Sequence, residues 1–304
     1  ATIYRKGLAW MVRGVFHLLL YRLIYRNFTP GPDEVASAGT LVLYMVSAYS
    51  LYLRVSGLFH LIVGMLCLFG FNLPETHHHY FLASGFNDLW RRINIYWKDF
   101  MMKIVYYPIF VRLRRRNATQ AMVVATLAVF LFSWLLHSYQ WFWILGDFPL
   151  TVVDAIFWTI FAITVLANSL LQARHGSARR LGAARISPRA AFVKAGKVVA
   201  MFSWMCLLWS FWTDNDIDAW FDMLAASARG PTREWLVLGA CLLGAVVVGG
   251  LYQLLLQPAY EAACAKVSFG GAAAGNGVVL LGLLWIGTPE LSGLEDQPLV
   301  ATVR

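Results

Sequence analysis

Charged residues are scarce in this sequence. They make up 13% of its 304 residues, whereas 59% of the residues are hydrophobic. A soluble globular protein carries about 25% charged residues, because its surface faces water. So little charge cannot cover a soluble surface, which excludes a soluble globular protein and predicts a polytopic membrane protein. We expect an all-α fold with about six to eight membrane-embedded helices and additional interfacial amphipathic helices.

Cysteine is also scarce, and the four cysteines stand alone in apolar surroundings: Cys67, Cys206, Cys241 and Cys264. No two of them have the spacing of a metal or redox motif. We therefore interpret them as small buried residues. The sequence also lacks a GxGxxG turn, a phosphate-binding loop and long internal repeats. These absences argue against dinucleotide-binding and P-loop enzymes, and we predict no bound cofactor and no metal.

Long apolar runs mark the expected membrane spans, because about 20 apolar residues cross a bilayer. The expected spans are residues 35–53, 54–71, 119–146, 151–171, 234–256 and 270–286. A further span ends with residues 200–212. We expect the first two to form a bent or re-entrant pair, which is tolerated only where protein covers the backbone. Residues 1–28 are apolar but interrupted by five cations, which favours an interfacial helix or a span buried against partners. We predict a single domain over residues 1–287 and a disordered tail over 288–304.

The net charge of +9 is concentrated in two basic clusters. One occupies residues 112–116 and the other fills residues 173–197. Because two expected spans separate them, both clusters fall on one side of the membrane, and by the positive-inside rule that side is the cytoplasm. Cytoplasmic loops explain the excess of cations better than nucleic-acid binding does, so we expect no nucleic-acid partner.

Residues 85–146 contain two features that predict a functional site. The first is an amphipathic helix expected over residues 86–110, whose apolar stripe includes Asn94, an amide that requires a hydrogen-bond partner. The second is His137, a titratable side chain inside a span, where the cost of desolvation makes it a functional candidate. Helical spacing places four more side chains on the same face: Ser133, Trp134, Gln140 and Trp141. The aromatic side chains would wall a dry pocket, and Ser133 or Gln140 would orient the imidazole.

Four motifs in this order resemble the membrane-bound O-acyltransferase (MBOAT) family. They are Leu68-Phe-Gly-Phe-Asn-Leu-Pro-Glu75, Leu89-Trp-Arg-Arg-Ile-Asn94, Tyr107-Pro108 and Trp134-Leu-Leu-His137. The similar branch is bacterial and includes alginate O-acetyltransferases and D-alanyl-teichoic acid transfer proteins. Those relatives have Trp-Arg-Arg-Trp-His where this chain has Ile93 and Asn94, which argues against proton transfer by residue 94. They also carry further spans before these motifs, so we expect either a C-terminal portion of a longer member or a shortened member.

The resemblance implies an O-acyltransferase in the inner membrane of a bacterium. It implies that His137 is the general base and that Asn94 is an amide donor to the reacting carbonyl or to His137. The acyl donor would be a cytoplasmic thioester, acetyl-CoA or an acyl carrier protein, and cations would bind its phosphates. The donor-binding residues would be Trp90, Arg91, Arg92 and Lys98. The acceptor would be a hydroxyl of a cell-envelope polysaccharide, with acetyl as the group moved and with membrane lipid and a periplasmic acyltransferase as partners.

Other interpretations of the sequence stay open. A non-catalytic membrane module or a transporter would also have isolated charges in its spans, although His137 is the one titratable residue in the core of the later spans. An acyltransferase acting on lipid or protein would use the same site. His77–His79 would bind zinc only with further ligands, so we interpret them as a polar surface loop. Asp216–Ala228 is predicted to be a short helix with an acidic cap and not a calcium site.

Overall fold

The computed structural model describes residues 2–146, 148, 150–175, 187–214 and 216–256, and every regular element in them is helical. The predicted all-α class is therefore confirmed. The long helices are α1 (Thr2–Phe28), α2 (Ala38–Leu68), α6 (Ala118–Leu145), α7 (Val152–His175), α8 (Pro188–Asp214) and α10 (Thr232–Leu251). The short helices are α3 (Phe86–Arg92), α4 (Ile95–Met101), α5 (Tyr107–Leu113) and α9 (Ile217–Ala228). Two 3-10 turns, η1 (Pro32–Glu34) and η2 (Tyr80–Leu82), and two π-helical turns, η3 (Met102–Tyr106) and η4 (Tyr252–Leu256), complete the described chain.

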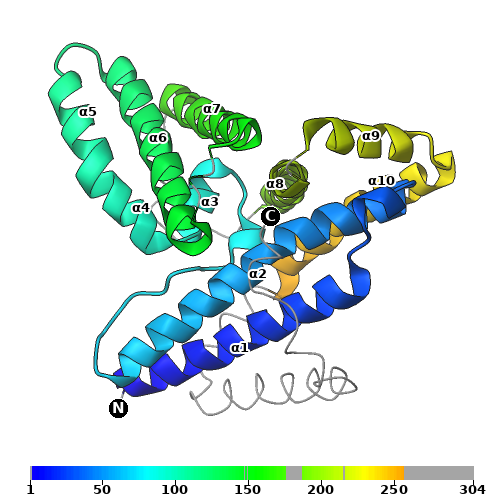
Figure 1. Ribbon diagram of the computed structural model, residues 1–304, viewed down its shortest axis with the longest axis horizontal. Coiled ribbons are helices and arrows are strands. Elements are labelled where there is room, and N and C mark those ends of the chain that lie inside the picture. The colour runs from blue at the N-terminus through cyan, green and yellow to red at the C-terminus, as the bar shows by residue number, and fades with distance from the viewer. Residues whose placement is uncertain (1, 147, 149, 176–186, 215, 257–304) are drawn as a thin grey trace.

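Six helices in the described residues are long and apolar enough to cross a membrane, namely α1, α2, α6, α7, α8 and α10 continued by η4. The protein is therefore a multi-pass membrane protein. The expected span at 270–286 and the expected tail at 288–304 lie outside the described residues. Figure 1 shows α8 end-on while α1, α2 and α6 lie across the view, so the helices cross at steep angles and do not form a parallel bundle. Counting spans does not settle the side of the basic clusters in such a fold, and their cytoplasmic position stays a prediction.

Helices α1 and α2 form an antiparallel pair that touches through glycines. A methyl group on Gly14 would lie 2.7 Å from the carbonyl oxygen of Gly57, and one on Gly57 would lie 2.9 Å from that of Gly14. Gly7 and Gly64 oppose each other in the same way, at 2.7 and 2.8 Å. In both pairs the carbonyl oxygen of the opposing glycine is among the nearest atoms, so the helices approach this closely only because the glycines have no side chain. Residues 1–28 therefore form a helix packed along its length against α2. This agrees with the second of the two expected arrangements, a span buried against a partner.

The expected bent pair at residues 35–53 and 54–71 is wrong, because α2 continues through both segments. Arg54, which stands at the expected boundary, interacts with the Tyr21 side chain of α1. A cation with such a partner does not interrupt the helix. The start of α2 is set by Ser37, whose hydroxyl accepts a hydrogen bond from the Thr40 amide, and a capping hydroxyl of this kind stabilises a helix end by about 1 kcal/mol.

The single amphipathic helix expected over residues 86–110 is also wrong, because the chain turns sharply between α3 and α4. Asn94 stands in this turn with a positive φ of 39°, a conformation that asparagine tolerates better than other side chains do. Two backbone hydrogen bonds from the preceding loop hold the turn. The His78 amide donates to the Arg92 carbonyl at 2.9 Å, and the Ile95 amide donates to the Thr76 carbonyl at 2.9 Å. We call Asn94 and its two neighbours the elbow.

An aromatic core joins α2, α3, α6, α7 and α8. Phe157 of α7 stacks on Trp212 of α8 with ring centroids 4.9 Å apart. The Trp212 indole also donates to Asp154 Oδ1 at 2.7 Å, and the Tyr44 hydroxyl of α2 donates to Asp214 Oδ2 at 3.3 Å. These polar links lie at the rim of the apolar core, so they fix how the long helices cross.

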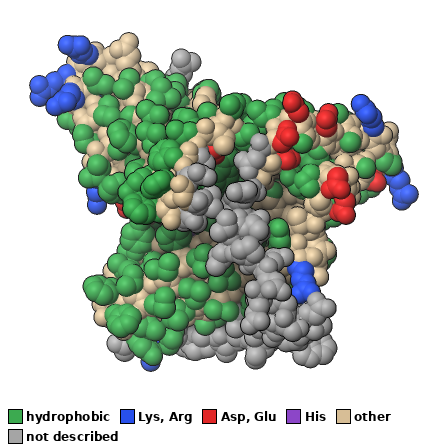
Figure 2. All heavy atoms as spheres, viewed as in Figure 1, with side chains coloured by type: hydrophobic (Ala, Val, Ile, Leu, Met, Phe, Trp, Pro, Cys, Tyr) green, Lys and Arg blue, Asp and Glu red, His purple; other side chains and the backbone are tan. Residues whose placement is uncertain are grey.

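Charged side chains gather at separate places on the visible face. Lys and Arg side chains gather over the α5–α6 turn, whereas Asp and Glu side chains gather over α9 (Figure 2). The predicted acidic cap of α9 is confirmed, because Asp216 Oδ1 accepts a hydrogen bond from the Ala219 amide at 3.0 Å. Helix α8 already begins at Pro188, so Lys194 and Lys197, expected within the basic loop at 173–197, are helical.

Candidate functional site

His137 lies on α6 between tryptophans from two other helices. Its ring centroid is 5.3 Å from that of Trp97 on α4 and 5.1 Å from that of Trp158 on α7. Its Nδ1 lies 2.7 Å from the carbonyl oxygen of Ser133. Because a carbonyl oxygen can only accept, Nδ1 carries the proton, and in the neutral imidazole Nε2 keeps its lone pair. The arrangement therefore holds the ring with a basic nitrogen directed away from its own helix.

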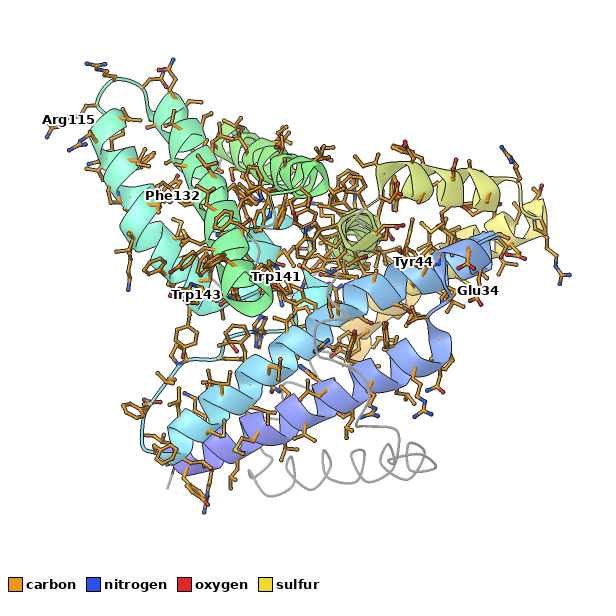
Figure 3. The ribbon with its side chains drawn as sticks, in the orientation of Figure 1. Glu34, Tyr44, Arg115, Phe132, Trp141 and Trp143 are labelled. Carbon is orange, nitrogen blue, oxygen red and sulfur yellow. The ribbon has the colours of Figure 1, made fainter. Side chains whose placement is uncertain are left out.

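Ser133 contributes to the site in two ways. The sequence predicted that the Ser133 or Gln140 side chain orients the imidazole, but the atom that holds His137 Nδ1 is the backbone carbonyl of Ser133. The fully buried Ser133 hydroxyl accepts a hydrogen bond from Trp97 Nε1 at 3.2 Å. Gln140, the alternative residue for orienting the imidazole, is exposed. Trp134 is partly buried, and its enclosed Nε1 has no hydrogen-bond partner among the described residues. Trp141 lies close to the C-terminal end of α6 (Figure 3).

Asn94 caps α4, the helix that carries Trp97. Its side-chain Oδ1 accepts a hydrogen bond from the Trp97 amide at 3.3 Å, and its carbonyl accepts one from the Lys98 amide at 3.0 Å. The cap uses the acceptor oxygen and leaves the Nδ2 group to donate. Asn94 and His137 are therefore connected through Trp97, which is hydrogen-bonded to the first and packed against the second.

A cavity of about 870 Å³, here the larger cavity, takes in three of the predicted donor-binding residues: Trp90, Arg91 and Lys98. Its walls combine these residues with apolar side chains of α6, among them Phe130, whose ring centroid is 5.4 Å from that of Trp90. His137 follows Phe130 by seven residues, which is two helical turns, or about 10 Å along α6. The same face of α6 therefore lines the larger cavity and carries His137.

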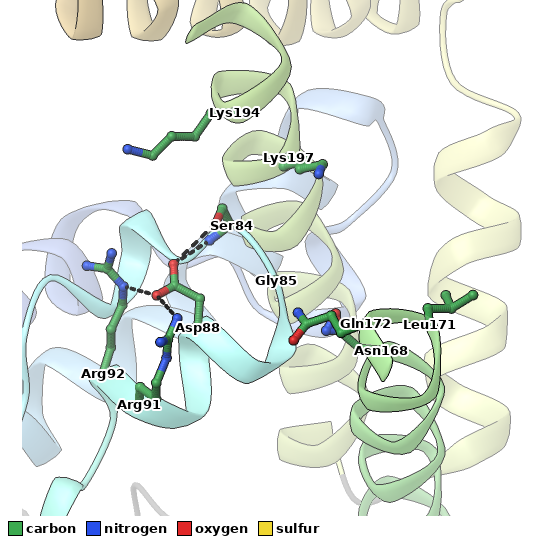
Figure 4. A pocket seen from close by; sticks show the side chains of 10 residues that line it. All are labelled: Ser84, Gly85, Asp88, Arg91, Arg92, Asn168, Leu171, Gln172, Lys194 and Lys197. Carbon is green, nitrogen blue, oxygen red and sulfur yellow. Dashed lines mark hydrogen bonds and ion pairs between the residues drawn. The ribbon is translucent and has the colours of Figure 1, made fainter. Parts of the chain in front are cut away.

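A second cavity of about 670 Å³, here the smaller cavity, lies where α3, α7 and α8 approach one another (Figure 4). It takes in Arg92, the remaining predicted donor-binding residue, and shares Arg91 with the larger cavity. Asp88 holds both guanidinium groups, with 3.0 Å to Arg92 Nε and 3.5 Å to an Arg91 terminal nitrogen. Burial raises the pKa of Asp88, but hydrogen bonds from Arg92 and Ser84 outweigh it, so the pKa is lowered and the carboxylate stays ionised.

No family model and no curated protein matches this chain. The candidate site is therefore supported by its geometry and not by a known relative. The resemblance to membrane-bound O-acyltransferases stays a prediction.

The structure also assembles a histidine cluster that the sequence did not indicate. His60 of α2 and His77 of the following loop are 1% and 2% exposed, with ring centroids 6.2 Å apart. His17 of α1 lies 5.5 Å from His60 between ring centroids. The prediction of a polar surface loop is therefore wrong for His77, whose ring packs against Tyr52, Phe59 and Tyr80. The signal in the sequence that could have indicated this cluster is that two apolar segments next to each other in the chain each contain a histidine, His17 and His60. No group of His, Cys, Asp or Glu in the described residues is arranged to hold a metal.

Glu75 is the anion of this histidine cluster. Its carboxylate pairs with Arg13, accepts a hydrogen bond from His78 Nδ1 at 2.9 Å, and lies 3.7 Å from His60 Nε2. Burial raises the pKa of Glu75, but the imidazoles and the Arg13 guanidinium outweigh it and lower the pKa to about 2. Burial, helped by the neighbouring histidines, lowers the pKa of His77 to about 3. The cluster is therefore stable with His77 neutral and Glu75 ionised.

Acid is expected to destabilise the protein through this cluster. Below pH 6.5 the unfolded chain protonates His77 while the folded protein does not, so the free energy of unfolding falls as the pH falls from 6.5 toward 3. The contribution of Glu75 is lost between pH 4.5 and 2. From pH 6.5 to 4 we expect His77 to cost at most about 3 kcal/mol. Thermal unfolding in detergent at pH 7, 5.5 and 4 measures the effect. His77→Phe should flatten the dependence, and an equally steep dependence in that variant would contradict the assignment.

Proposed function

We propose that this protein is a membrane O-acyltransferase that uses His137 as its general base. The observation that supports this most is the hydrogen bond from His137 Nδ1 to the Ser133 carbonyl, because it leaves Nε2 unprotonated in the neutral ring. Trp97 and Trp158 pack on the same ring and shield it from water. A shielded imidazole nitrogen is suited to removing a proton from an acceptor hydroxyl.

The proposed reaction is a direct transfer with no acyl-enzyme. Nε2 of His137 takes the proton of the acceptor hydroxyl while its oxygen attacks the thioester carbonyl. The carbon–sulfur bond then breaks, and the departing thiolate takes the proton from the imidazolium. The products are an ester and a thiol, and His137 returns to its neutral form. Asn94 Nδ2 is placed in this proposal as a donor to the oxyanion, a kind of contact that contributes about 10²–10³-fold to the rate.

The donor and acceptor are proposed from the cavities and from the sequence resemblance together. The larger cavity has an apolar wall for an acyl thioester arm and cations for its phosphates. We propose acetyl-CoA or an acyl carrier protein as the donor and a hydroxyl of a cell-envelope polysaccharide as the acceptor. The setting is a bacterial inner membrane with the basic clusters on the cytoplasmic side.

Acetyl transfer in membranes tests the proposal. Membranes that contain the chain, and matched membranes without it, are incubated with radiolabelled acetyl-CoA, and label on envelope carbohydrate is counted. We expect label only where the chain is present. Equal labelling of the two membranes, with acetyl-CoA and with an acetylated carrier protein alike, would contradict the proposed function.

The role of Asn94 is tested by a change that keeps its cap. In Asn94→Asp the Oδ1 acceptor is retained and aspartate caps a helix as well as asparagine does, but the Nδ2 donor is lost. We expect the unfolding midpoint to change little and label transfer to fall about 10²-fold. Asn94→Gly, which permits the positive φ but removes the cap, is the comparison. If Asn94→Asp transfers label as wild type does and only Asn94→Gly is impaired, Asn94 serves as a cap and not as an oxyanion donor.

Transport is a second candidate function, and the histidine cluster is the observation that favours it. Ionisable groups buried between membrane helices are costly and often form proton paths. His17 and His60 add such groups on the first two helices and Glu75 adds one on the loop after α2, whereas the sequence had indicated His137 alone in the later spans. A transporter would move its solute in vesicles equally well with His137→Ala, whereas the proposed acyltransferase would lose its activity.

A further inference from the structure

The smaller cavity gathers cations from two helices that are far apart in the sequence. Arg91 and Arg92 come from the end of α3, whereas Lys194 and Lys197 stand one turn apart on α8. Asp88 is the one carboxylate among the residues that line the cavity, so the lining has an excess of three positive charges. Figure 4 shows both lysines on α8, with Lys194 extending over Arg92 and Lys197 extending in the opposite direction in this view. Cations held this close repel one another unless an anion joins them.

The two lysines are available for such an anion. Asp88 is already shared by Arg91 and Arg92. Lys194 and Lys197 form no ion pair within the described part of the chain, and both side chains are exposed. Two lysines on the wall of one cavity, with no carboxylate of their own, are suited to a ligand that brings its own negative charge.

A neutral donor on the cavity wall supplies independent evidence. Asn168 of α7 lines the smaller cavity, and its enclosed Nδ2 has no hydrogen-bond partner among the described residues. A Cβ atom built on Gly85 would lie 3.6 Å from Asn168 Oδ1 and 4.0 Å from Nδ2, so Gly85 lies directly beside this amide on the cavity wall. Enclosed donors are nearly always paired in native structures, and an oxygen acceptor in the cavity would complete this one.

We propose that the smaller cavity binds a phosphate group. Phosphate brings close to two negative charges and three oxygens, which match the excess of cations and the amide donor, whereas a carboxylate would neutralise one cation only. At about 670 Å³ the cavity exceeds the phosphate itself and accepts a phosphate ester. The phosphate belongs either to a soluble thioester donor or to a lipid headgroup. A phosphate that belongs to a thioester donor would deepen the proposed function and rests on it. Phosphate binding by the cavity does not rest on the proposed function.

Binding of pyrophosphate to the purified chain in detergent tests the proposal. The site variant is the double change Lys194→Gln with Lys197→Gln, and the charge-matched control is Arg229→Gln with Arg233→Gln at the α9–α10 turn. Calorimetric titration is expected to show about tenfold weaker binding for the site variant and less than a twofold change for the control, because two of the charge-assisted contacts are lost. Asn168→Asp, which turns the donor into a carboxylate, should weaken binding as well. Equal unfolding midpoints verify that the variants are folded.

A lipid arm distinguishes the two sources of phosphate. The same variants are placed in nanodiscs that contain phosphatidylglycerol or phosphatidylcholine, and bound lipid is counted by native mass spectrometry. Loss of phosphatidylglycerol in the site variant, with unchanged pyrophosphate binding, identifies a headgroup site; the reverse identifies a soluble phosphate ester. If the site variant equals the control in both arms, the proposal is wrong. Wild-type pyrophosphate binding without any acetyl transfer would support the phosphate site and count against the acyltransferase alone.

Discussion

Replacing His137 by alanine is expected to slow acetyl transfer by about 10²–10⁴-fold, because the base that accepts the hydroxyl proton is removed. The loss should appear in kcat, with little change in the KM for the thioester, since the cavities that would hold the donor do not depend on the imidazole. His137→Gln, which keeps a polar side chain of similar length but cannot take up a proton, should be nearly as slow. A packing role for the ring would instead let glutamine restore much of the rate.

The control for His137→Ala is Leu135→Ala on the same helix, where Leu135 is 37% exposed and faces away from the core. This variant removes three carbon atoms at the surface of α6, as many as the histidine change removes, yet it should transfer label at nearly the wild-type rate. The measurement is initial rate against thioester concentration in membranes with matched amounts of protein. Retention of more than a third of the wild-type kcat by His137→Ala would rule out general-base catalysis by this residue.

Adding one methyl group to Gly14 is expected to destabilise the protein by roughly 2–3 kcal/mol. The new Cβ would lie 2.7 Å from the Gly57 carbonyl oxygen, and backbone cannot rotate aside as a side chain can. The α1–α2 pair must separate, which weakens its packing and the contact of His17 with His60. Replacing glycine by alanine within a helix normally stabilises it by up to about 1 kcal/mol. The steric clash must exceed this gain for Gly14→Ala to lower the free energy of unfolding.

Gly239→Ala on α10 provides the same chemical change without an obstacle, because no described atom lies within 4 Å of the added methyl group. This control should be neutral or stabilising by up to about 1 kcal/mol. Unfolding midpoints in detergent and protease resistance of the α1–α2 turn compare the two variants. If Gly14→Ala proves as stable as Gly239→Ala, the close approach of the two helices is not what the structure indicates.

The membrane-spanning helices could be predicted because their signal is local. A run of about 20 apolar residues is sufficient for α6, α7 and α10, and an aspartate before a short amphipathic run was sufficient for the cap of α9. The continuity of α2 could not be predicted in this way. In the sequence, Arg54 looks like a boundary between two spans, because a charge inside a membrane helix is costly. Its partner Tyr21, which lies more than 30 residues earlier in the chain, offsets that cost.

The elbow and the histidine cluster could not be predicted because they depend on contacts between distant segments. The apolar stripe around Asn94 continues on both sides of the turn, so its period gives no sign of a left-handed residue. Three consecutive histidines are polar by composition, and the burial of His77 requires the rings of α2 that surround it. Long-range contacts of this kind override a local pattern.

The candidate site was predicted in part. His137 followed from its position within a span, and Ser133 from helical spacing, because both signals lie within two turns of one helix. Trp158 packs on the same imidazole from another helix, and nothing in the spacing of α7 sets it apart from neighbouring aromatic residues. Lys194 and Lys197 were predicted to lie in a basic loop, and their place on the wall of the cavity that Arg91 also lines depends on how the long helices pack.

The two backbone hydrogen bonds at the elbow link the histidine cluster to the cations. Thr76 and His78, the residues on either side of His77, are the ones bonded to Ile95 and Arg92. The loop that carries His77 and the C-terminal end of α3 are therefore held together by main-chain hydrogen bonds on both sides of the histidine. Any shift of the loop around His77 must therefore either break these two hydrogen bonds or move the end of α3 with it.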